Sequence, residues 1–259
     1  MDRVIIIIML LLAGCQSQKE LNMNSQKNTR NLHHFNFRTA FMSGFYEGEY
    51  TMKQLLQKGD FGLGTFNNLE GEMIVLDGKI YRATTDGLAT EVNDLQVKTP
   101  SAMVTFFEAD QEITFTNLTR DKLIAWINEN LDTQRDMYAL KVTGSFASLK
   151  ARSQDPIYEK PFPEIEEVVD NMVYHDLKEV SGTLVGFQLP PYLDNINYPG
   201  LHFHFVSQHE TQPAGGCAPA FTIKQATLSI MKLHAFSVDI PQTSDYYKLE
   251  MDQEKNKVM

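Results

Sequence analysis

The sequence predicts an α+β protein, a two-lobed mixed β-sheet or partial barrel with a few short helices. Segments with the two-residue alternation of strands greatly outnumber segments with helical periodicity. Asp77-Gly78 and Asp86-Gly87 separate such segments, and Asp-Gly pairs favour the tight turns of β-hairpins. Many strands joined by turns, with few helices between them, are typical of the α+β class.

Two amphipathic helices are expected in the first part of the chain. Residues 51–58 place apolar side chains on one face and end at Gly59, which stops the helix. Residues 120–131 repeat this pattern, and Thr119 is in the position of an N-cap. The remaining segments alternate as strands, at residues 61–66, 72–76, 80–83, 137–142 and 145–152.

Pro161 and Pro163 mark the expected boundary between the lobes, because proline ends regular structure. A short acidic helix is expected at 164–172, followed by strands at 179–188, 201–207, 221–231 and 235–240. We therefore expect an N-terminal α/β lobe over residues 33–162 and a C-terminal, β-rich, metal-binding lobe over residues 163–259.

The first residues predict export and lipid attachment. The apolar run from Val4 to Leu12 spans only about 14 Å of helix, too short for a membrane span of ~30 Å and typical of a signal peptide. The order Leu12-Ala13-Gly14-Cys15 resembles a bacterial lipobox, so residues 1–14 are expected to be removed and Cys15 to be lipidated. The alternative is an ordinary secretory signal in which Cys15 has no role.

Residues 15–32 lack an apolar face and are expected to form a flexible tether. The protein would then be an exported lipoprotein, and Gln16 indicates the periplasmic face of an outer membrane. Its formal net charge of −10 disfavours nucleic acid and anionic membrane surfaces as partners, which leaves the lipid as the membrane contact.

His202 and His204 form a candidate metal site. Residues i and i+2 of a strand point to the same face, so both imidazoles can reach one ion, while Phe203 and Phe205 face the core. Downstream, Gly215-Gly216 can turn a loop sharply and present Cys217, whose thiolate is a strong zinc ligand. His209, in the same loop, is the rival third ligand.

Several stretches together resemble the α-acetolactate decarboxylase family. They cover about residues 35 to 245 in a consistent order and spacing, which makes the combination far more specific than any one motif. The matching stretches are residues 62–67, 69–74, 76–78, 144–146 leading to Arg152, 182–187 and 200–205.

The resemblance implies a carboxy-lyase that converts 2-acetolactate to acetoin with zinc (Zn2+) as a Lewis acid. It places Glu72 and Arg152 in the catalytic site and adds a tail glutamate, for which Glu254 is preferred to Glu250. Thr65, on a neighbouring strand position, is expected to contact the substrate or a bound water, with a threonine chosen for its β propensity as the alternative. The family holds its zinc with three histidines. Here Cys217 stands at the third position, so the expected ligands are His202, His204 and Cys217.

This departure leaves two alternatives open. Either His209 has become the third ligand, or the site is degenerate and the chain is a non-catalytic lipoprotein that binds a metal or a small hydroxy-keto acid. Arg152 has a structural alternative as well, an ion pair with Asp155 or Glu159. The sequence does not fix the oligomeric state, a homodimer included.

Overall fold

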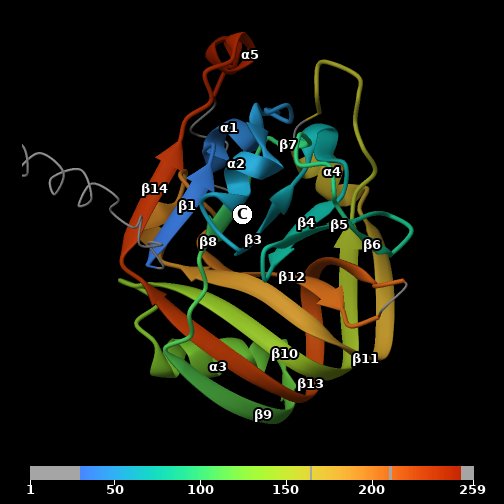
Figure 1. The fold of residues 1–259 in the computed structure, drawn as a ribbon, viewed down its shortest axis with the longest axis vertical. Coiled ribbons are helices and arrows are strands. Elements are labelled where there is room, and N and C mark those ends of the chain that lie inside the picture. Colours follow the sequence, from blue (N-terminus) through green and yellow to red (C-terminus); the bar gives the residue numbers. More distant parts are fainter. Residues whose placement is uncertain (1–29, 164, 210–211, 252–259) are drawn as a thin grey trace, which may run out of the picture.

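The fold was established from a computed structural model that describes residues 30–163, 165–209 and 212–251 (Figure 1). The expected signal peptide, the lipidated Cys15, almost all of the tether and Glu254 lie outside the described residues. In the described part of the chain, no helix combines the length and apolarity that a membrane span requires.

The first of two large sheets has seven strands in the order β14-β1-β8-β3-β4-β5-β6 (Figure 1). β14 and β1 pair in parallel, and the other neighbours are antiparallel. The strands are β14 (Ala235–Asp239), β1 (Asn31–Phe35), β8 (Ala102–Thr105), β3 (Phe61–Thr65), β4 (Glu72–Leu76), β5 (Lys79–Ala83) and β6 (Ala89–Glu91). A small separate sheet pairs β2 (Tyr50–Thr51) with β7 (Lys98–Thr99).

The second large sheet is built from long, curved strands that close partly on themselves (Figure 1). Its order is β10-β11-β12-β13-β9, and β10 also pairs with β13. These strands are β10 (Met137–Ser153), β11 (Val173–Leu189), β12 (Gly200–Ser207), β13 (Gly215–Leu233) and β9 (Gln111–Thr119). All of their pairings are antiparallel.

Short helices surround the sheets. α3 (Arg120–Asn130) begins at Thr119, whose side chain accepts a hydrogen bond from the Lys122 amide and so forms the expected N-cap. α3 buries Leu123 and Ile127 against the second sheet. The others are α1 (Arg38–Met42), α2 (Met52–Leu56), α4 (Ile165–Asp170) and α5 (Ser244–Lys248), with two 3₁₀ turns at Asn67–Leu69 and Pro191–Leu193.

The faces of the two large sheets pack against each other around an apolar core. β3 contributes Phe61 and Leu63 to this core. β4 contributes Ile74, and its partly buried Leu76 packs at the margin. Met73, on the opposite face of β4, packs into a separate cluster with α2. Because side chains alternate along a strand, Thr65 and Glu72 extend the face that meets the second sheet.

The α+β class and the sheet-rich architecture are confirmed by two large sheets and a few short helices. β10 runs without a break through the strand pattern expected at 137–142 and 145–152. The strands expected at 179–188 and 221–231 begin earlier, at Val173 and Gly215. β1, α1, β2, β6 to β9 and α5 are additional to the expected elements. The division at residues 162 and 163 stays a prediction about domains; sheet pairing crosses it, because β10 pairs with both β11 and β13.

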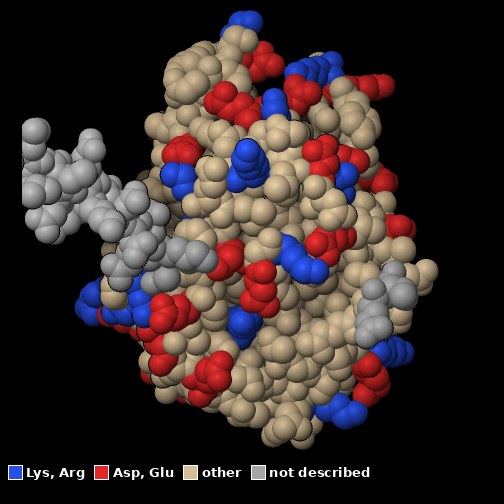
Figure 2. All heavy atoms as spheres, viewed as in Figure 1, with Lys and Arg blue, Asp and Glu red and all other residues tan. Residues whose placement is uncertain are grey.

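The distribution of surface charge agrees with the expectation that an acidic protein does not bind nucleic acid. On the face drawn in Figure 2, basic side chains of the described residues are interspersed with acidic ones. Ion pairs among the described residues include Arg30 with Asp110 at 2.7 Å and Arg82 with Glu70 at 3.1 Å. This face therefore offers an alternating pattern of charge rather than the continuous basic surface that nucleic-acid binding uses.

His34 on β1 makes stability depend on pH. Its side chain is 1% exposed, and burial lowers its pKa from 6.5 to about 3. Since the unfolded chain binds this proton first, stability falls as pH drops from 6.5 towards 3, by roughly 2 kcal/mol between pH 6.5 and 5. Urea unfolding of the metal-free protein tests this effect. Between pH 6.5 and 5, the free energy of unfolding should change less in His34→Gln than in wild type, by roughly 2 kcal/mol. An equal change in both proteins would show that His34 is not the cause.

Candidate metal centre and active site

Strand register brings the candidate ligands together. Cys217 on β13 lies opposite His204 on β12 and opposite Arg152 on β10. Residues paired directly across antiparallel strands place their side chains on the same face, so these three side chains meet. The partial closure of the sheet thus positions Cys217 between β12, which carries the two candidate metal-binding histidines, and β10, which carries Arg152.

Gly215 and Gly216 were expected to turn a loop sharply, and the structure gives them a different role. Gly215 and Gly216 lie inside β13 and not in a loop. A Cβ on Gly216 would lie 2.6 Å from the carbonyl oxygen of Arg152, and its φ is +144°. Glycine is needed here because the backbones of β10 and β13 approach too closely for a side chain. The close approach delivers Cys217 to the site.

The donor atoms of His202, His204 and Cys217 all lie within 4.8 Å of one another. The Cys217 Sγ and His202 Nε2 atoms are 3.6 Å apart. Tetrahedral zinc with Zn–S and Zn–N bonds of ~2.3 and ~2.05 Å separates such donors by roughly 3.6 Å. The three residues therefore fit a zinc ion that keeps a fourth position for another ligand.

The surroundings prepare both histidines for metal binding. His204 Nδ1 lies 2.8 Å from the Met73 carbonyl oxygen, to which it donates, so that Nε2 keeps its lone pair. Burial lowers the pKa of His202 to about 4, and burial also lowers the pKa of His204. Both imidazoles are neutral at physiological pH, the form that binds metal ions. Phe203 and Phe205 pack on the opposite face, as expected.

Glu72 approaches the metal ligands from the first sheet. Its carboxylate oxygen Oε2 lies 3.4 Å from His204 Nε2, and its side chain is about 10% exposed. Burial raises its pKa to about 7, against the opposing effects of His202 and Arg152. A carboxyl group with this pKa can both give and take a proton near neutral pH.

Thr65 lies beside Glu72, because the two residues pair across β3 and β4. Its hydroxyl donates a hydrogen bond to the Gly71 carbonyl oxygen at 2.8 Å. Thr65 lines the cavity, and the lone pairs of its hydroxyl oxygen can accept a hydrogen bond from a ligand bound there.

Arg152 supplies a permanent positive charge. Its Nη1 donates to the Tyr174 hydroxyl at 3.4 Å, while its buried Nε has no hydrogen-bond partner among the described residues. Burial lowers its pKa, but Cys217 and Tyr174 outweigh burial, so the net shift is upward and the guanidinium stays charged. The alternative partner Asp155 accepts a hydrogen bond from Thr85 instead, at 2.6 Å.

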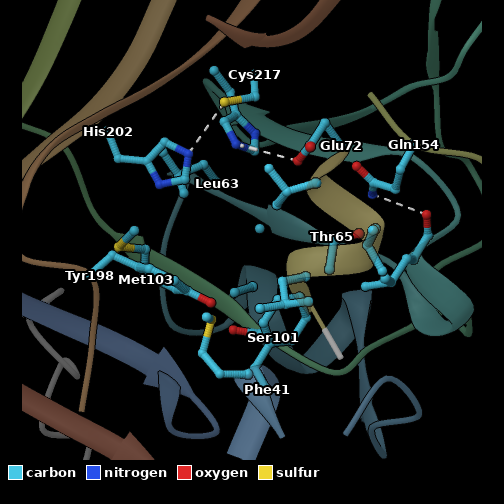
Figure 3. A pocket seen from close by; sticks show the side chains of 18 of the residues that line it. Phe41, Leu63, Thr65, Glu72, Ser101, Met103, Gln154, Tyr198, His202 and Cys217 are labelled. Atoms are coloured by element: carbon cyan, nitrogen blue, oxygen red, sulfur yellow. Dashed lines mark hydrogen bonds and ion pairs between the residues drawn. The ribbon is translucent and has the colours of Figure 1, made fainter. Parts of the chain in front are cut away.

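These residues line one cavity of about 350 Å³ (Figure 3). Glu72 and Cys217 lie at one end with the histidines, and Phe41 and Ser101 lie towards the other (Figure 3). Much of the wall is apolar, formed by side chains from α1, α4 and the first sheet, namely Phe41, Met42, Leu63, Met103, Ile165, Val168 and Val169. The polar groups are therefore concentrated around the candidate metal position.

The structure adds two polar residues that the sequence analysis missed. Gln154 donates through Nε2 to the Leu69 carbonyl oxygen at 3.1 Å, and its buried Oε1 lacks a hydrogen-bond partner within the described chain. Tyr198 also lines the cavity. The available signal was proximity in sequence, since Gln154 follows Arg152 by two residues and Tyr198 precedes His202 by four.

Two alternative site residues lie elsewhere. His209 is exposed, and its Nδ1 accepts a hydrogen bond from the Gln212 amide at 3.1 Å, outside the group of three donors. Glu250 is exposed as well, and Glu254 lies outside the described residues. The structure thus brings Cys217, and not His209, to the two histidines.

Fold and site together define a class of protein: a sheet-based enzyme whose cavity combines candidate metal ligands, a buried carboxyl group and an arginine. The model of one family, alpha-acetolactate decarboxylase, matches residues 32–253. The chain belongs to the alpha-acetolactate decarboxylase family, and it is accordingly an enzyme of the lyase class.

Relatives of this family match most of the chain. The alpha-acetolactate decarboxylase of Brevibacillus brevis is 37% identical over 215 residues, covering 83% of this chain and 74% of the relative. That of Bacillus subtilis strain 168 is 31% identical and covers 83% of both chains. The crystal structure of alpha-acetolactate decarboxylase from the same strain superposes with a TM-score of 0.81 at 30% identity, covering 86% of this chain and 94% of that one.

Proposed function

We propose that this protein decarboxylates 2-acetolactate to acetoin, with zinc held by His202, His204 and Cys217. The observation that carries the proposal is the convergence of three zinc-compatible donors, the buried Glu72 and the charged Arg152 on one cavity. When bound there, zinc supplies Lewis-acid stabilisation of negative charge on substrate oxygens.

The reaction breaks the bond between the carboxylate carbon and C2. CO2 leaves, the bonding electron pair moves onto the neighbouring carbonyl group, and an enediolate forms. A proton must then be added to carbon to give acetoin. The site therefore needs positive charge near the substrate oxygens and a proton donor beside the reacting carbon.

Arg152 and Glu72 meet these two needs. Arg152 adds fixed positive charge next to Cys217, and its Nε–H has no hydrogen-bond partner among the described residues. Glu72, kept partly protonated by burial, delivers the proton from the side of the first sheet. Thr65, next to it, can hold a substrate hydroxyl or a water molecule through its free lone pairs.

Arg152→Lys tests the role of the guanidinium. Lysine keeps the charge but loses the planar set of five donors, so kcat/KM for acetolactate should fall about 10- to 100-fold while zinc content stays constant. Lys150→Ala is the matched control, because Lys150 lies two residues earlier on β10 and its side chain is 44% exposed. An unchanged kcat/KM in Arg152→Lys would remove Arg152 from the mechanism.

The competing function is that of a non-catalytic protein with the same fold that binds metal or a small hydroxy-keto acid. The assay that separates the two is acetoin formation from racemic acetolactate, together with measurement of bound metal. Zinc binding without acetoin would support the competing function. Acetoin formation that stops on chelation and returns with zinc would support the decarboxylase.

We also propose that the protein is an exported lipoprotein, anchored through Cys15 at the periplasmic face of the outer membrane. The proposal rests on the apolar run at residues 4–12 and the lipobox-like sequence that follows. Cys15→Ser should abolish incorporation of labelled fatty acid and move the protein out of the membrane fraction. Continued labelling would contradict the anchor.

A further inference from the structure

Tyr198 carries an uncommitted hydroxyl group into the cavity. It lies in the segment between the 3₁₀ turn at Pro191–Leu193 and β12, and it lines the same cavity as Glu72 and His202. Figure 3 shows its hydroxyl directed towards the interior, on the side of Ser101. The hydroxyl makes no hydrogen bond with any part of the chain that the structure describes, so it is free to bind a ligand.

The Tyr198 ring is fixed by its neighbours. Its centroid lies 6.2 Å from that of His202 at an interplanar angle of 74°, and the Arg38 guanidinium carbon lies 5.5 Å from the same centroid. Arg38 is itself held by an ion pair with Asp194 at 2.8 Å. The ring also packs against the apolar cluster that contains Phe41 and Leu69. These contacts hold the hydroxyl in place before a ligand enters.

The hydroxyl is a donor at any physiological pH. Burial raises the pKa of Tyr198, although Arg38 opposes the shift. The phenol therefore keeps its proton, and the nearby positive charge of Arg38 strengthens it as a donor. A protonated phenol facing a largely apolar wall suits a ligand group that accepts hydrogen bonds.

The substrate offers three acceptor groups, the hydroxyl, the ketone and the carboxylate. The ketone oxygen develops negative charge during the reaction, so it and the adjacent hydroxyl belong near Arg152 and the candidate metal ligands. The carboxylate loses its charge as CO2 departs, so an ion pair with arginine would stabilise the ground state more than the transition state. A neutral phenol in an apolar wall can orient the carboxylate and stabilises the ground state less than an ion pair would.

We propose that Tyr198 is a substrate-binding residue that orients the departing carboxylate by donating a hydrogen bond to it. This inference rests on the proposed function for the choice of substrate. It divides the cavity into a region around Glu72 and Arg152, where charge develops, and a region around Tyr198, where the carboxylate is held.

Tyr198→Phe tests the inference, because it removes one oxygen and keeps the ring. Two stable ligands differ only in the carboxylate: 2,3-dihydroxy-2-methylbutanoate, which is the substrate with its ketone reduced, and 2,3-butanediol. Calorimetry on the zinc-loaded protein should show affinity for the acid falling about 10- to 100-fold in the variant, as for loss of a hydrogen bond to a charged group. Affinity for the diol should stay within about twofold.

Tyr192→Phe is the matched control, since Tyr192 lies six residues earlier, is 59% exposed and donates to the Arg135 carbonyl oxygen outside the cavity. It should change neither affinity. Equal losses for acid and diol in Tyr198→Phe, or no loss for either, would overturn the inference. Binding is measured without turnover, so a wild-type protein that forms no acetoin would contradict the proposed function and leave this result to be judged separately.

Discussion

Replacing Glu72 by glutamine should lower the turnover of acetolactate by about 10²- to 10⁴-fold, the usual contribution of a positioned general acid. Glutamine has nearly the same shape but cannot donate a carboxylic proton. The carboxyl group is buried, and its pKa of about 7 makes it a proton donor near neutral pH. Acetoin formation by the purified variant measures the loss.

Two further measurements make this result specific. Bound zinc should stay at the wild-type level, because Glu72 is not among the three clustered donors. Glu70→Gln is the matched control: Glu70 lies two residues earlier, its side chain is 41% exposed, and it pairs with Arg82. Turnover close to wild type in Glu72→Gln would exclude this carboxyl group as the proton donor.

The second large effect is expected at Cys217. Cys217→Ser replaces a strong zinc ligand by a weak one. Mutation of a residue that only hydrogen-bonds to a metal ligand lowers metal affinity by up to about 100-fold. Loss of a ligand itself should therefore lower zinc affinity by more than about 100-fold. Cys217→His restores the side chain that the family resemblance places there and should retain zinc. Metal analysis after dialysis against a chelator of known affinity provides the comparison.

His209→Ala serves as the control for this series. His209 is exposed and lies outside the cluster, so its loss should leave zinc stoichiometry unchanged. The reverse pattern, in which His209→Ala loses zinc and Cys217→Ser keeps it, would show that the loop histidine is the true third ligand.

Local patterns predicted most of the strands near the site. β4 matches its expected range because Glu72, Ile74 and Leu76 alternate with residues that pack on the other face. The Asp77-Gly78 turn forms as expected, with both residues at positive φ. Such short-range features depend on neighbours in sequence, which a single chain displays directly.

Pairing between distant segments could not be read in the same way. β1 and β14 pair in parallel although about 200 residues separate them, and neither segment has a sequence feature that predicts which strand it pairs with. β10 runs continuously through Gly144, which lies between the strand stretches expected at 137–142 and 145–152. That glycine is needed where β10 crosses β13, since a Cβ there would lie 2.3 Å from the Gln225 carbonyl oxygen.

The residues of the site also divide into those predictable from local spacing and those that depend on contacts between distant segments. His202 and His204 were predictable because their spacing on one strand is local. The choice between Cys217 and His209 depended on β12 and β13 register, which only the structure supplies. Tyr198 and Gln154 carry no motif of their own, and their roles follow from the cavity that they line.

The most direct test of the central claim is acetoin formation by the purified protein at defined zinc content. We expect one zinc ion per chain, release of CO2 and acetoin in equal amounts, loss of both on chelation, and recovery when zinc is restored. A zinc-loaded, folded protein that leaves acetolactate unconverted would contradict this expectation.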